Sequence, residues 1–293
     1  MVVRSMNAVK KLLIITKSDP AAANTAAAVR QWLGQRNVDS VLYDADAAPS
    51  ALCAAASSCD AVVIMGGDGT MIGLARKLWQ TRVPLAGMNF GRVGFLNELP
   101  KSGWESPLTD LIQGKWLVER HMALRWRVLK QSGPGLEAAA EGIAVNDVVT
   151  AHGIVARTVS LEVQIDDVLF STLSGDGIII GTPLGSTAYT ASAGGPLAMP
   201  SLNAMLITPI CPFSGGFSPL VLPMNSHIRL KACRPNSDII VSIDGQEDHT
   251  LAFGDVLEVC GMADGLHMLV SEGNWYLKRL ISRGIIFPGP GIQ

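Results

Sequence analysis

Short apolar runs alternate with alanine-rich stretches through the first third of the chain. Apolar runs of this length predict buried strands, and the longer alanine-rich stretches predict helices. The predicted strands are 12–16, 40–43, 61–65 and 83–88, and the predicted helices are 21–33, 51–57 and 70–79. Strands that alternate with helices form a mainly parallel sheet covered by helices, so we expect an α/β domain over residues 1–115.

The pattern changes near Gly114, after which apolar and polar residues alternate. The alternation is rough over 116–130 and almost strict over 159–165, which is typical of half-buried antiparallel strands. An Asp166-Asp167 pair then signals a turn. Further strands are predicted at 205–210, 228–232, 239–243 and 256–260. Short strands at close spacing predict an all-β domain over residues 116–270.

Two stretches depart from this pattern. Glycine-rich residues 171–196 interrupt the second domain and contain one predicted helix start. The tail, 271–293, contains a predicted helix at 275–282. This tail is a candidate to pack back on the first domain.

The composition is that of a compact folded chain without a strong charge. Of 293 residues, 48% are hydrophobic and 16% are charged, and the formal net charge is −2. A chain of this length can bury a large core. The near-neutral charge provides no basic surface for nucleic acid or an acidic membrane. A nucleotide ligand would therefore have to be held by local features.

The chain has five cysteines in an odd and scattered set: Cys53, Cys59, Cys211, Cys233 and Cys260. No two form a CxxC pair, and no His lies at zinc-ligand spacing from one of them, so no metal site is predicted. Unpaired thiols are typical of a reducing cytoplasm. The N-terminus lacks the apolar region of a leader, and no apolar run is long enough to span a bilayer. We therefore expect a cytoplasmic protein without a membrane-spanning segment.

The segment Gly66-Gly67-Asp68-Gly69-Thr70 directly follows the predicted strand 61–65. Glycines allow a sharp turn and a close approach of the backbone to a phosphate or a ribose. Their N–H groups and the start of the next helix favour an anion, and Asp68 lies where open α/β sheets bind ligands. A Walker GxxxxGK[ST] loop is absent. An ordinary turn built from Gly and Asp is the alternative interpretation.

A second glycine-acid loop, Gly175-Asp176-Gly177, precedes the apolar run 178–180 and a loop of sequence GTPLGSTAY at 181–189. Ser186 or Thr187 is suited to cap a helix over 188–193, which would leave hydroxyl and N–H groups free for a ligand. Tyr189 offers a flat face to a base or a hydroxyl to a ribose. An ordinary strand-to-helix corner is the alternative.

Three further polar groups adjoin predicted strands. Asn146-Asp147 lies within the apolar segment 143–149, where a buried polar pair is costly unless it is hydrogen-bonded. The two side chains are suited to bind sugar hydroxyls. A bulge or turn at the edge of a strand is the alternative interpretation. The sequence NFGRVGFL at 89–96 makes Phe95 available to stack on a ring of a ligand. A structural loop is the alternative interpretation. Asp244-Gly245-Gln246 predicts a turn between strands.

Taken together and in this order, these segments resemble the NAD kinase family. The resemblance rests on GGDGT at 66–70, NxGxxGFL at 89–96, the Asn-acid pair at 146–147 and DG…TPxGSTAY at 176–189, and continues at 192, 194–196, 207–212 and 244–246. GGDG alone is shared with lipid kinases and phosphofructokinases, whereas TPxGSTAY in company with GGDGT is specific. The resemblance covers about residues 10–280 and implies a Rossmann-like N-terminal domain and a C-terminal, β-sandwich-like domain.

The resemblance implies transfer of a phosphoryl group from ATP or polyphosphate, with Mg²⁺, to the 2′-hydroxyl of the adenosine ribose of NAD. Asp68 would be the general base that deprotonates this hydroxyl. The implied phosphate loop consists of Gly66, Gly67 and Thr70. The implied substrate-binding residues are Gly69, Phe95, Asn146, Asp147, Arg157, Ser174, Asp176, Leu184, Thr187, Ala188, Tyr189, Thr190, Ser192 and Gln246. The family also implies a homodimer or homotetramer in which a neighbouring subunit contributes to the site.

Three positions depart from the family pattern. Leu184 stands where most members have Thr or Ser, and Phe213 replaces a frequent His, so a hydroxyl and a histidine contact are missing. Ser174 stands where relatives vary, which leaves the choice between ATP and polyphosphate open. A non-catalytic dinucleotide-sensing module is the alternative function. An NAD-dependent dehydrogenase is disfavoured because the chain has no GxGxxG.

Overall fold

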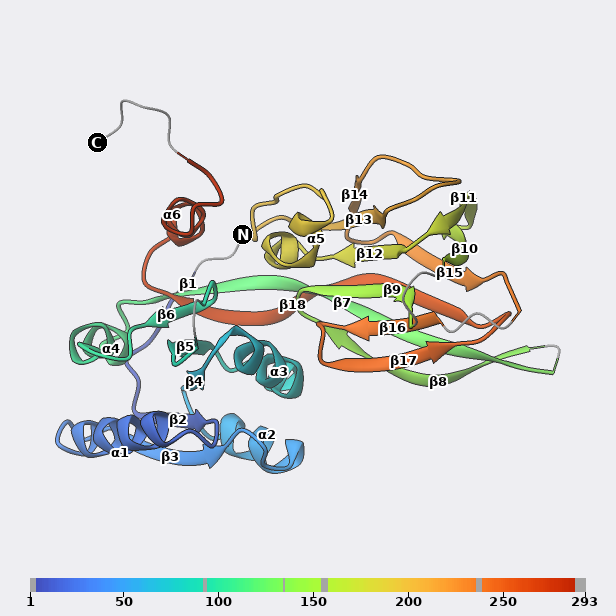
Figure 1. Cartoon of the computed structure of the whole chain (residues 1–293). Coiled ribbons are helices and arrows are strands. Elements are labelled where there is room, and N and C mark those ends of the chain that lie inside the picture. The colour runs from blue at the N-terminus through green and yellow to red at the C-terminus, as the bar shows by residue number, and fades with distance from the viewer. Residues whose placement is uncertain (1–3, 92–93, 134, 154–157, 236–238, 288–293) are drawn as a thin grey trace. The chain divides into compact units, whose positions relative to one another are not determined.

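The computed structural model describes residues 4–91, 94–133, 135–153, 158–235 and 239–287. The chain forms two compact units, which we describe separately. Unit 1 comprises Met1–Arg120 with Leu266–Gln293, and unit 2 comprises His121–Gly265. The chain passes from unit 1 to unit 2 within β7 (Leu117–Ser132) and returns within β18 (Val256–Val270) (Figure 1).

Unit 1 is built on a parallel sheet with the strand order β5-β4-β2-β3. Its four strands are β2 (Lys11–Thr16), β3 (Asp39–Asp44), β4 (Ala61–Gly66) and β5 (Leu85–Asn89). The short β6 (Asn97–Leu99) pairs in parallel with β5, Met268 of β18 pairs with Leu85, and β1 (Arg4–Ser5) pairs with β7. All six residues of β4 are buried, as expected for a central strand of a sheet covered on both faces.

Helices accompany this sheet. They are α1 (Pro20–Gly34), α2 (Pro49–Ser57), α3 (Asp68–Leu78), η1 (Trp79–Thr81), α4 (Glu105–Ile112) and α6 (Trp275–Ser282). Of these, α1, α2, α3 and α6 correspond to the predicted helices, whereas α4 was not predicted. In α1 the buried residues Ala22, Ala26, Val29 and Leu33 recur at helical spacing and form one face. The carboxylate of Asp19 accepts the N–H of Ala22 and caps this helix. The α/β prediction is confirmed.

The tail helix α6 belongs to unit 1. Its Trp275 donates an indole N–H to Glu119 Oε2 at 2.8 Å, and both side chains are buried. Burial raises the pKa of Glu119, the indole donor opposes that effect, and Glu98 adds to it. Arg279 and Arg283 of the same region donate to backbone carbonyls of residues 94–97. The helix predicted at 275–282 is confirmed.

Unit 2 consists of two antiparallel sheets. The first has the order β14-β13-β12-β9-β16-β17, and the second contains β11-β10-β15-β18 together with β7 and β8. Their remaining strands are β8 (Gly135–Ala144), β9 (Asp147–His152), β10 (Val159–Ile165), β11 (Val168–Gly175), β12 (Gly177–Gly181), β13 (Ala204–Ile210), β14 (Leu220–Pro223), β15 (His227–Ala232), β16 (Ile239–Ile243) and β17 (Glu247–Leu251).

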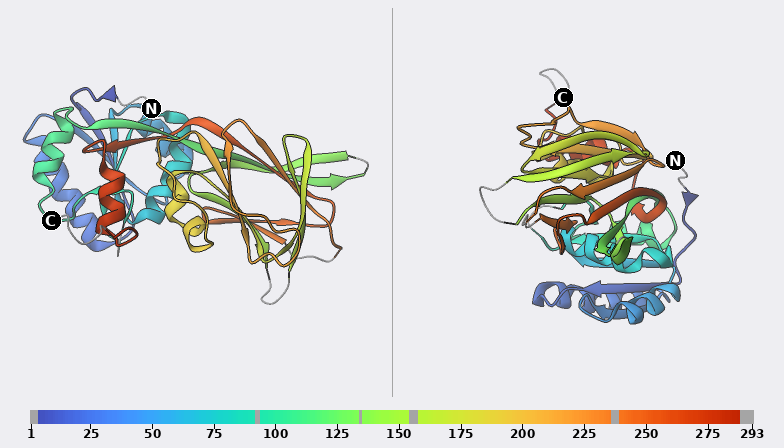
Figure 2. Two further views of the ribbon diagram at one scale, coloured as in Figure 1. Left: turned by 90° about the horizontal axis from the view of Figure 1, so that it is seen from above. Right: turned by 90° about the vertical axis from the view of Figure 1, so that its right-hand side faces the viewer.

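Buried side chains from both sheets form one core in unit 2. Val148 and Ile180 come from the first sheet, and Leu161 and Leu257 come from the second. Two inner faces that bury alternate residues against each other make a β-sandwich, so the all-β prediction is confirmed. Figures 1 and 2 show the β7–β8 hairpin extending past the other strands of this unit. Its residues 135–139 are accordingly exposed.

Strand β12 was not among the predicted strands, because it lies in the glycine-rich stretch that interrupts the predicted pattern; a strand was expected there only in the alternative interpretation of a strand-to-helix corner. Its residues are GIIIG, and all five are buried between β9 and β13. A fully buried strand shows no apolar-polar alternation, so periodicity does not distinguish it from other apolar runs. Two short helices follow it, η2 (Leu184–Thr187) and α5 (Tyr189–Ser192).

Replacing Trp275 with Phe should lower the free energy of unfolding by about 1–3 kcal/mol, because a buried carboxylate loses a hydrogen-bond donor while the aromatic packing largely remains. Denaturant unfolding followed by circular dichroism would measure this loss. The control is Leu277→Ala on the same helix, where the side chain is 48% exposed and a change within about 0.5 kcal/mol is expected. Equal effects of the two variants would contradict the proposed importance of the buried pair.

Candidate active site

In unit 1, the carboxylate of Asp68 accepts hydrogen bonds from three donors among the described residues. They are the backbone N–H of Phe95, the backbone N–H of Leu96 at 3.2 Å and the side-chain amide Nδ2 of Asn97 at 2.7 Å. Asp68 is the first residue of α3, two residues earlier than the predicted helix start, and Gly67 is the N-cap. A carboxylate in the first turn interacts favourably with the helix dipole. The side chain of Asp68 is therefore fixed at the end of β4.

Glycines in this region are required by close contacts. A Cβ on Gly66 would lie 2.7 Å from Thr70 Cβ, and a Cβ on Gly91 would lie 2.9 Å from Gly67 Cα. A Cβ on Gly94 would lie 2.8 Å from the carboxylate of Asp68. The GGDGT loop thus lies against residues 89–91 and 94–96 within unit 1, with Gly69 exposed and Thr70 half-buried.

Phe95 packs on the tail helix. Its ring centroid lies 6.1 Å from that of Trp275 and 5.5 Å from that of Tyr276, both in edge-to-face geometry. Such contacts favour a fixed ring orientation. Phe95 remains half-buried, and its backbone N–H is one of the donors to Asp68.

In unit 2, the carboxylate of Asp244 fixes the loop that carries Asn146 and Asp147. It accepts the N–H of Val145 at 2.9 Å, of Asn146 at 2.7 Å and of Asp147 at 3.1 Å. Asp244 has a φ of +52°, a conformation that Asp adopts more readily than most residues, and Gly245 follows it in the turn. Sequence reasoning identified this turn but missed the role of its carboxylate, because the partners are about a hundred residues away in the chain.

The TPLGST loop holds the same segment from its other side. Thr182 donates its N–H to the carbonyl of Asn146 at 2.8 Å and its hydroxyl to the carbonyl of Val145 at 2.7 Å. The hydroxyl of Thr182 in turn accepts the N–H of Gly185 at 3.0 Å. A Cβ on Gly185 would lie 2.5 Å from Asn146 Cα, so only glycine fits this position. Leu184 is buried.

Asp147 is a buried carboxyl group with an unusual pKa. Its carboxylate accepts the backbone N–H of Tyr189, and it lies near Asp244. The pKa of Asp147 is raised from 3.8 to about 7, mainly by burial and further by the charge of Asp244, while the hydrogen bond from the Tyr189 amide opposes the rise. Strongly shifted carboxyl groups are frequent at functional sites.

The helix after this loop begins differently from the prediction. Helix α5 starts at Tyr189 and has no side-chain cap. The proposed cap Ser186 instead exchanges hydrogen bonds with the backbone of Ala198, so the capping prediction was wrong. Thr187 and Ala188 are half-buried, Tyr189 and Ser192 are exposed, and Thr190 is buried.

Two predicted residues lie at the opposite end of β12. Gly181, at one end, pairs with Asp147, whereas Gly177, at the other end, directly follows Asp176. Four residue steps along a strand correspond to about 13 Å. Asp176 is exposed and Ser174 is buried there. The structure therefore does not bring these two residues next to the Asn146–Asp147 loop.

The remaining predicted substrate-binding residues, Gln246 and Arg157, are not part of the Asn146–Asp147 loop or the TPLGST loop. Gln246 is exposed in the turn that begins with Asp244. Arg157 lies outside the described residues. Among the residues that the structure describes, no group of three or more His, Cys, Asp or Glu side chains could hold a metal ion. Within the same ranges, no helix is long and apolar enough to cross a membrane.

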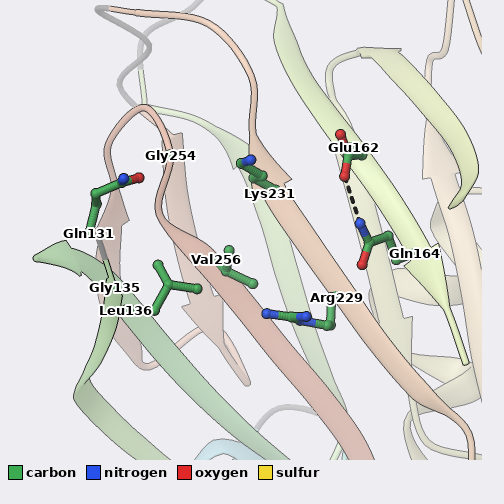
Figure 3. Close-up of a pocket in the computed structure, with 9 residues that line it drawn as sticks. All are labelled: Gln131, Gly135, Leu136, Glu162, Gln164, Arg229, Lys231, Gly254 and Val256. Carbon is green, nitrogen blue, oxygen red and sulfur yellow. Dashed lines mark hydrogen bonds between the residues drawn. The ribbon is translucent and has the colours of Figure 1, made fainter. Parts of the chain in front are cut away.

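Unit 2 also contains a cavity of about 410 Å³ away from these loops (Figure 3). Arg229 and Lys231 of β15 and Glu162 and Gln164 of β10 contribute polar side chains to it, and Gln164 donates to Glu162 at 2.7 Å. None of the residues that line this cavity belongs to the predicted substrate-binding set.

Two family models match the chain. The model of the ATP-NAD kinase N-terminal domain matches residues 22–116, and that of the ATP-NAD kinase C-terminal domain matches residues 145–268. The NAD kinase of Nitratidesulfovibrio vulgaris (strain DP4) is 39% identical over 282 residues, which cover 96% of this chain and 93% of that protein. The NAD kinase of Oleidesulfovibrio alaskensis is 36% identical over 278 residues, with 94% of each chain covered.

Solved structures share the fold. The yeast NADH kinase complexed with NADH superposes with a TM-score of 0.80 at 24% identity, covering 98% of this chain and 91% of that one. The NAD kinase from Archaeoglobus fulgidus in complex with ATP gives a TM-score of 0.71 at 23% identity, covering 92% and 96%. The family resemblance expected from the motifs and the expected two-domain fold are both confirmed. The chain belongs to the NAD kinase family.

Proposed function

We propose that this NAD kinase phosphorylates the 2′-hydroxyl of the adenosine ribose of NAD, with ATP as donor and Asp68 as the general base. The observation that carries this assignment is the fixed carboxylate of Asp68 at the end of β4. The family membership and the relatives named NAD kinase support the substrate, and the related structure in complex with ATP supports the donor.

The hydrogen bonds to Asp68 leave room for one more. A carboxylate has about four acceptor sites, and three of those on Asp68 are occupied by Phe95, Leu96 and Asn97. The remaining acceptor site takes the proton of the 2′-hydroxyl of NAD while the oxygen of that hydroxyl attacks the terminal phosphorus of ATP in line. The new oxygen–phosphorus bond forms while the bond to the ADP oxygen breaks. Asp68 then releases the proton to solvent.

The residues described do not provide a cluster of metal ligands, so we assign the Mg²⁺ to the phosphates of the donor. Bound there, this ion would neutralise charge that develops on the transferred group. The phosphate loop would be Gly66, Gly67 and Thr70, whose backbone N–H groups adjoin the start of α3.

In unit 2, we propose that Asn146 and Asp147 bind hydroxyls of an NAD ribose. The backbone of this pair is fixed from two sides by Asp244 and Thr182. An amide that donates and accepts, beside a carboxyl group, suits a sugar diol. Thr187, Ala188, Tyr189, Thr190 and Ser192 would shape the rest of this binding surface, with the exposed Tyr189 ring available for stacking.

Other predicted contacts remain proposals. Asp176 and Ser174 precede Gly177, which itself lies about 13 Å along β12 from Gly181, the partner of Asp147. One ribose is too small to bridge this distance. We assign Asp176 and Ser174 to a distant part of NAD or to the site of a second copy in a homodimer or homotetramer. Phe95, Gly69 and Gln246 are likewise proposed to contact the ligand. All five cysteines are free, which supports a cytoplasmic location.

Purified protein incubated with NAD, ATP and Mg²⁺ should form NADP, and the Asp68→Asn variant should lose roughly 10²–10⁴-fold in kcat. Its KM for NAD should change by less than about threefold, because the amide retains the shape of the carboxylate. The matched control is Asp46→Asn, an exposed aspartate of unit 1, which should retain normal turnover. Near-normal kcat in Asp68→Asn would remove this residue from its role.

The same assay separates the alternatives. A dinucleotide-sensing module would bind NAD without forming NADP, and replacing ATP by polyphosphate tests the donor. Leu184, one of the departures that suggest a sensor, is buried in the loop that fixes Asn146, which gives it a packing role. We expect NADP formation with ATP.

The raised pKa of Asp147 predicts a pH-dependent stability. In the unfolded chain this carboxyl group ionises near 3.8, whereas in the folded protein it ionises near 7. Between these pH values the folded state binds one more proton than the unfolded state, so the free energy of unfolding falls as pH rises, by about 1.4 kcal/mol per unit. Asp147→Asn abolishes this ionisation.

Between pH 5 and pH 8, the stability of Asp147→Asn relative to the wild type should therefore increase by roughly 2.5 kcal/mol. Denaturant unfolding at both pH values would measure this change. The exposed Asp176→Asn provides the control, for which the difference from the wild type should stay constant within about 0.5 kcal/mol. Parallel pH curves for wild type and Asp147→Asn would contradict the prediction.

A further inference from the structure

Asn97 is the only side chain among the three described donors to Asp68. It opens β6 and is 3% exposed, and its Nδ2 donates to Asp68 Oδ1 at 2.7 Å. The other two donors, Phe95 and Leu96, use their backbone N–H groups. A substitution at 97 can therefore remove one hydrogen bond from Asp68 while both main-chain donors remain.

Two glycines make the space that the amide of Asn97 occupies. A Cβ on Gly94 would lie 2.6 Å from Asn97 Nδ2, and a Cβ on Gly87 would overlap Asn97 Oδ1. Gly87 lies within β5, where a glycine weakens a strand unless close approach requires it. The sheet thus contains a fitted place for this amide beside the carboxylate.

The side-chain amide of Asn97 makes fewer hydrogen bonds than expected of a buried group with a purely structural role. Its Oδ1 is buried and has no hydrogen-bond partner within the described part of the chain. The reverse orientation would place this oxygen against the carboxylate of Asp68, so two acceptors would face each other. An unpaired buried acceptor costs stability, which an apolar side chain of the same shape would avoid. The donor to Asp68 is what asparagine adds at this position.

The backbone of Asn97 is held by the tail helix. Arg279 Nη2 donates to the carbonyl of Asn97 at 2.6 Å, and Arg283 Nη2 donates to the carbonyl of Gly94 at 2.7 Å. Arg279 also lies 3.4 Å from the carboxylate of Glu98. Residues 94–97, which include all three donors to Asp68, are therefore anchored on α6 in unit 1.

We propose that Asn97 is a positioning residue for the phosphoryl transfer, which holds Asp68 with Oδ1 turned inward and Oδ2 available to the reacting hydroxyl. This inference rests on the proposed role of Asp68 as general base. Among the residues that the structure describes, Oδ1 accepts from Leu96 and Asn97, whereas Oδ2 accepts from Phe95 alone. The free acceptor site is thus on Oδ2, and the proton of the 2′-hydroxyl goes to that oxygen.

The test is Asn97→Leu, which keeps the approximate shape and removes the donor. We expect kcat to fall 10- to 100-fold while KM for NAD and ATP changes less than about threefold. The midpoint of thermal unfolding should stay the same or rise, because the unpaired acceptor is removed. Asn97→Ala, which cannot clash with its neighbours, should show the same loss of kcat. Asn24→Leu, at an exposed position of α1, is the control and should retain normal kcat.

A double variant separates this inference from the proposed function. If Asn97 acts through Asp68, adding Asn97→Leu to Asp68→Asn should lower kcat less than twofold further. Normal kcat in both Asn97 variants, or losses that multiply in the double variant, would overturn the positioning role while leaving Asp68 as base. A lowered unfolding midpoint with a rise in KM would indicate a structural role instead. Full activity of Asp68→Asn alone would refute the proposed function.

Discussion

Hydrogen-bond donors of two short segments, most of them backbone N–H groups, converge on two aspartate carboxylates, and the candidate site depends on these hydrogen bonds. In unit 1, residues 95–97 donate to Asp68. In unit 2, residues 145–147 donate to Asp244. Charge-assisted hydrogen bonds of this kind are about twice as strong as neutral ones and fix the direction of the segment as well as its position. Each aspartate thus converts a flexible loop into a defined surface.

The two carboxylates differ in what they leave available. Asp68 is half-buried and retains an acceptor site, so it suits chemistry on a hydroxyl. Asp244 uses its oxygens to hold the loop that presents Asn146 and Asp147. Its charge also contributes to the raised pKa of Asp147. One aspartate is therefore suited to act directly, and the other determines the environment of its neighbours.

Glycine allows these arrangements at two critical contacts. Gly94 provides space for both Asn97 Nδ2 and the carboxylate of Asp68, and Gly185 lies directly on the backbone of Asn146. In both places a Cβ would push the adjacent segment away from its hydrogen-bond partners. The packing also explains why the tail matters, because Arg279 of α6 holds the carbonyl of the residue that contacts Asp68.

The sequence by itself determined the two kinds of fold, the family and the loops that carry the chemistry. Apolar periodicity depends only on near neighbours, which is why the α/β half, most strands and the helix at 275–282 were predicted correctly. Strand β12 was anticipated only as the alternative interpretation of its segment, because a fully buried strand has no alternation. The cap at Ser186 was predicted wrongly because a tertiary partner, Ala198, competes for its hydroxyl.

Only the tertiary structure decided which polar groups meet. Asn97 and Asp68 are 29 residues apart, and Asp244 is 98 residues from Asn146. No local pattern records such distances, because strand order and sheet register create them. The same register places Asp176 at the far end of β12 from Asp147, although both belong to motifs of one family. Residue type indicates the available chemistry, and packing decides which groups are close enough to use it.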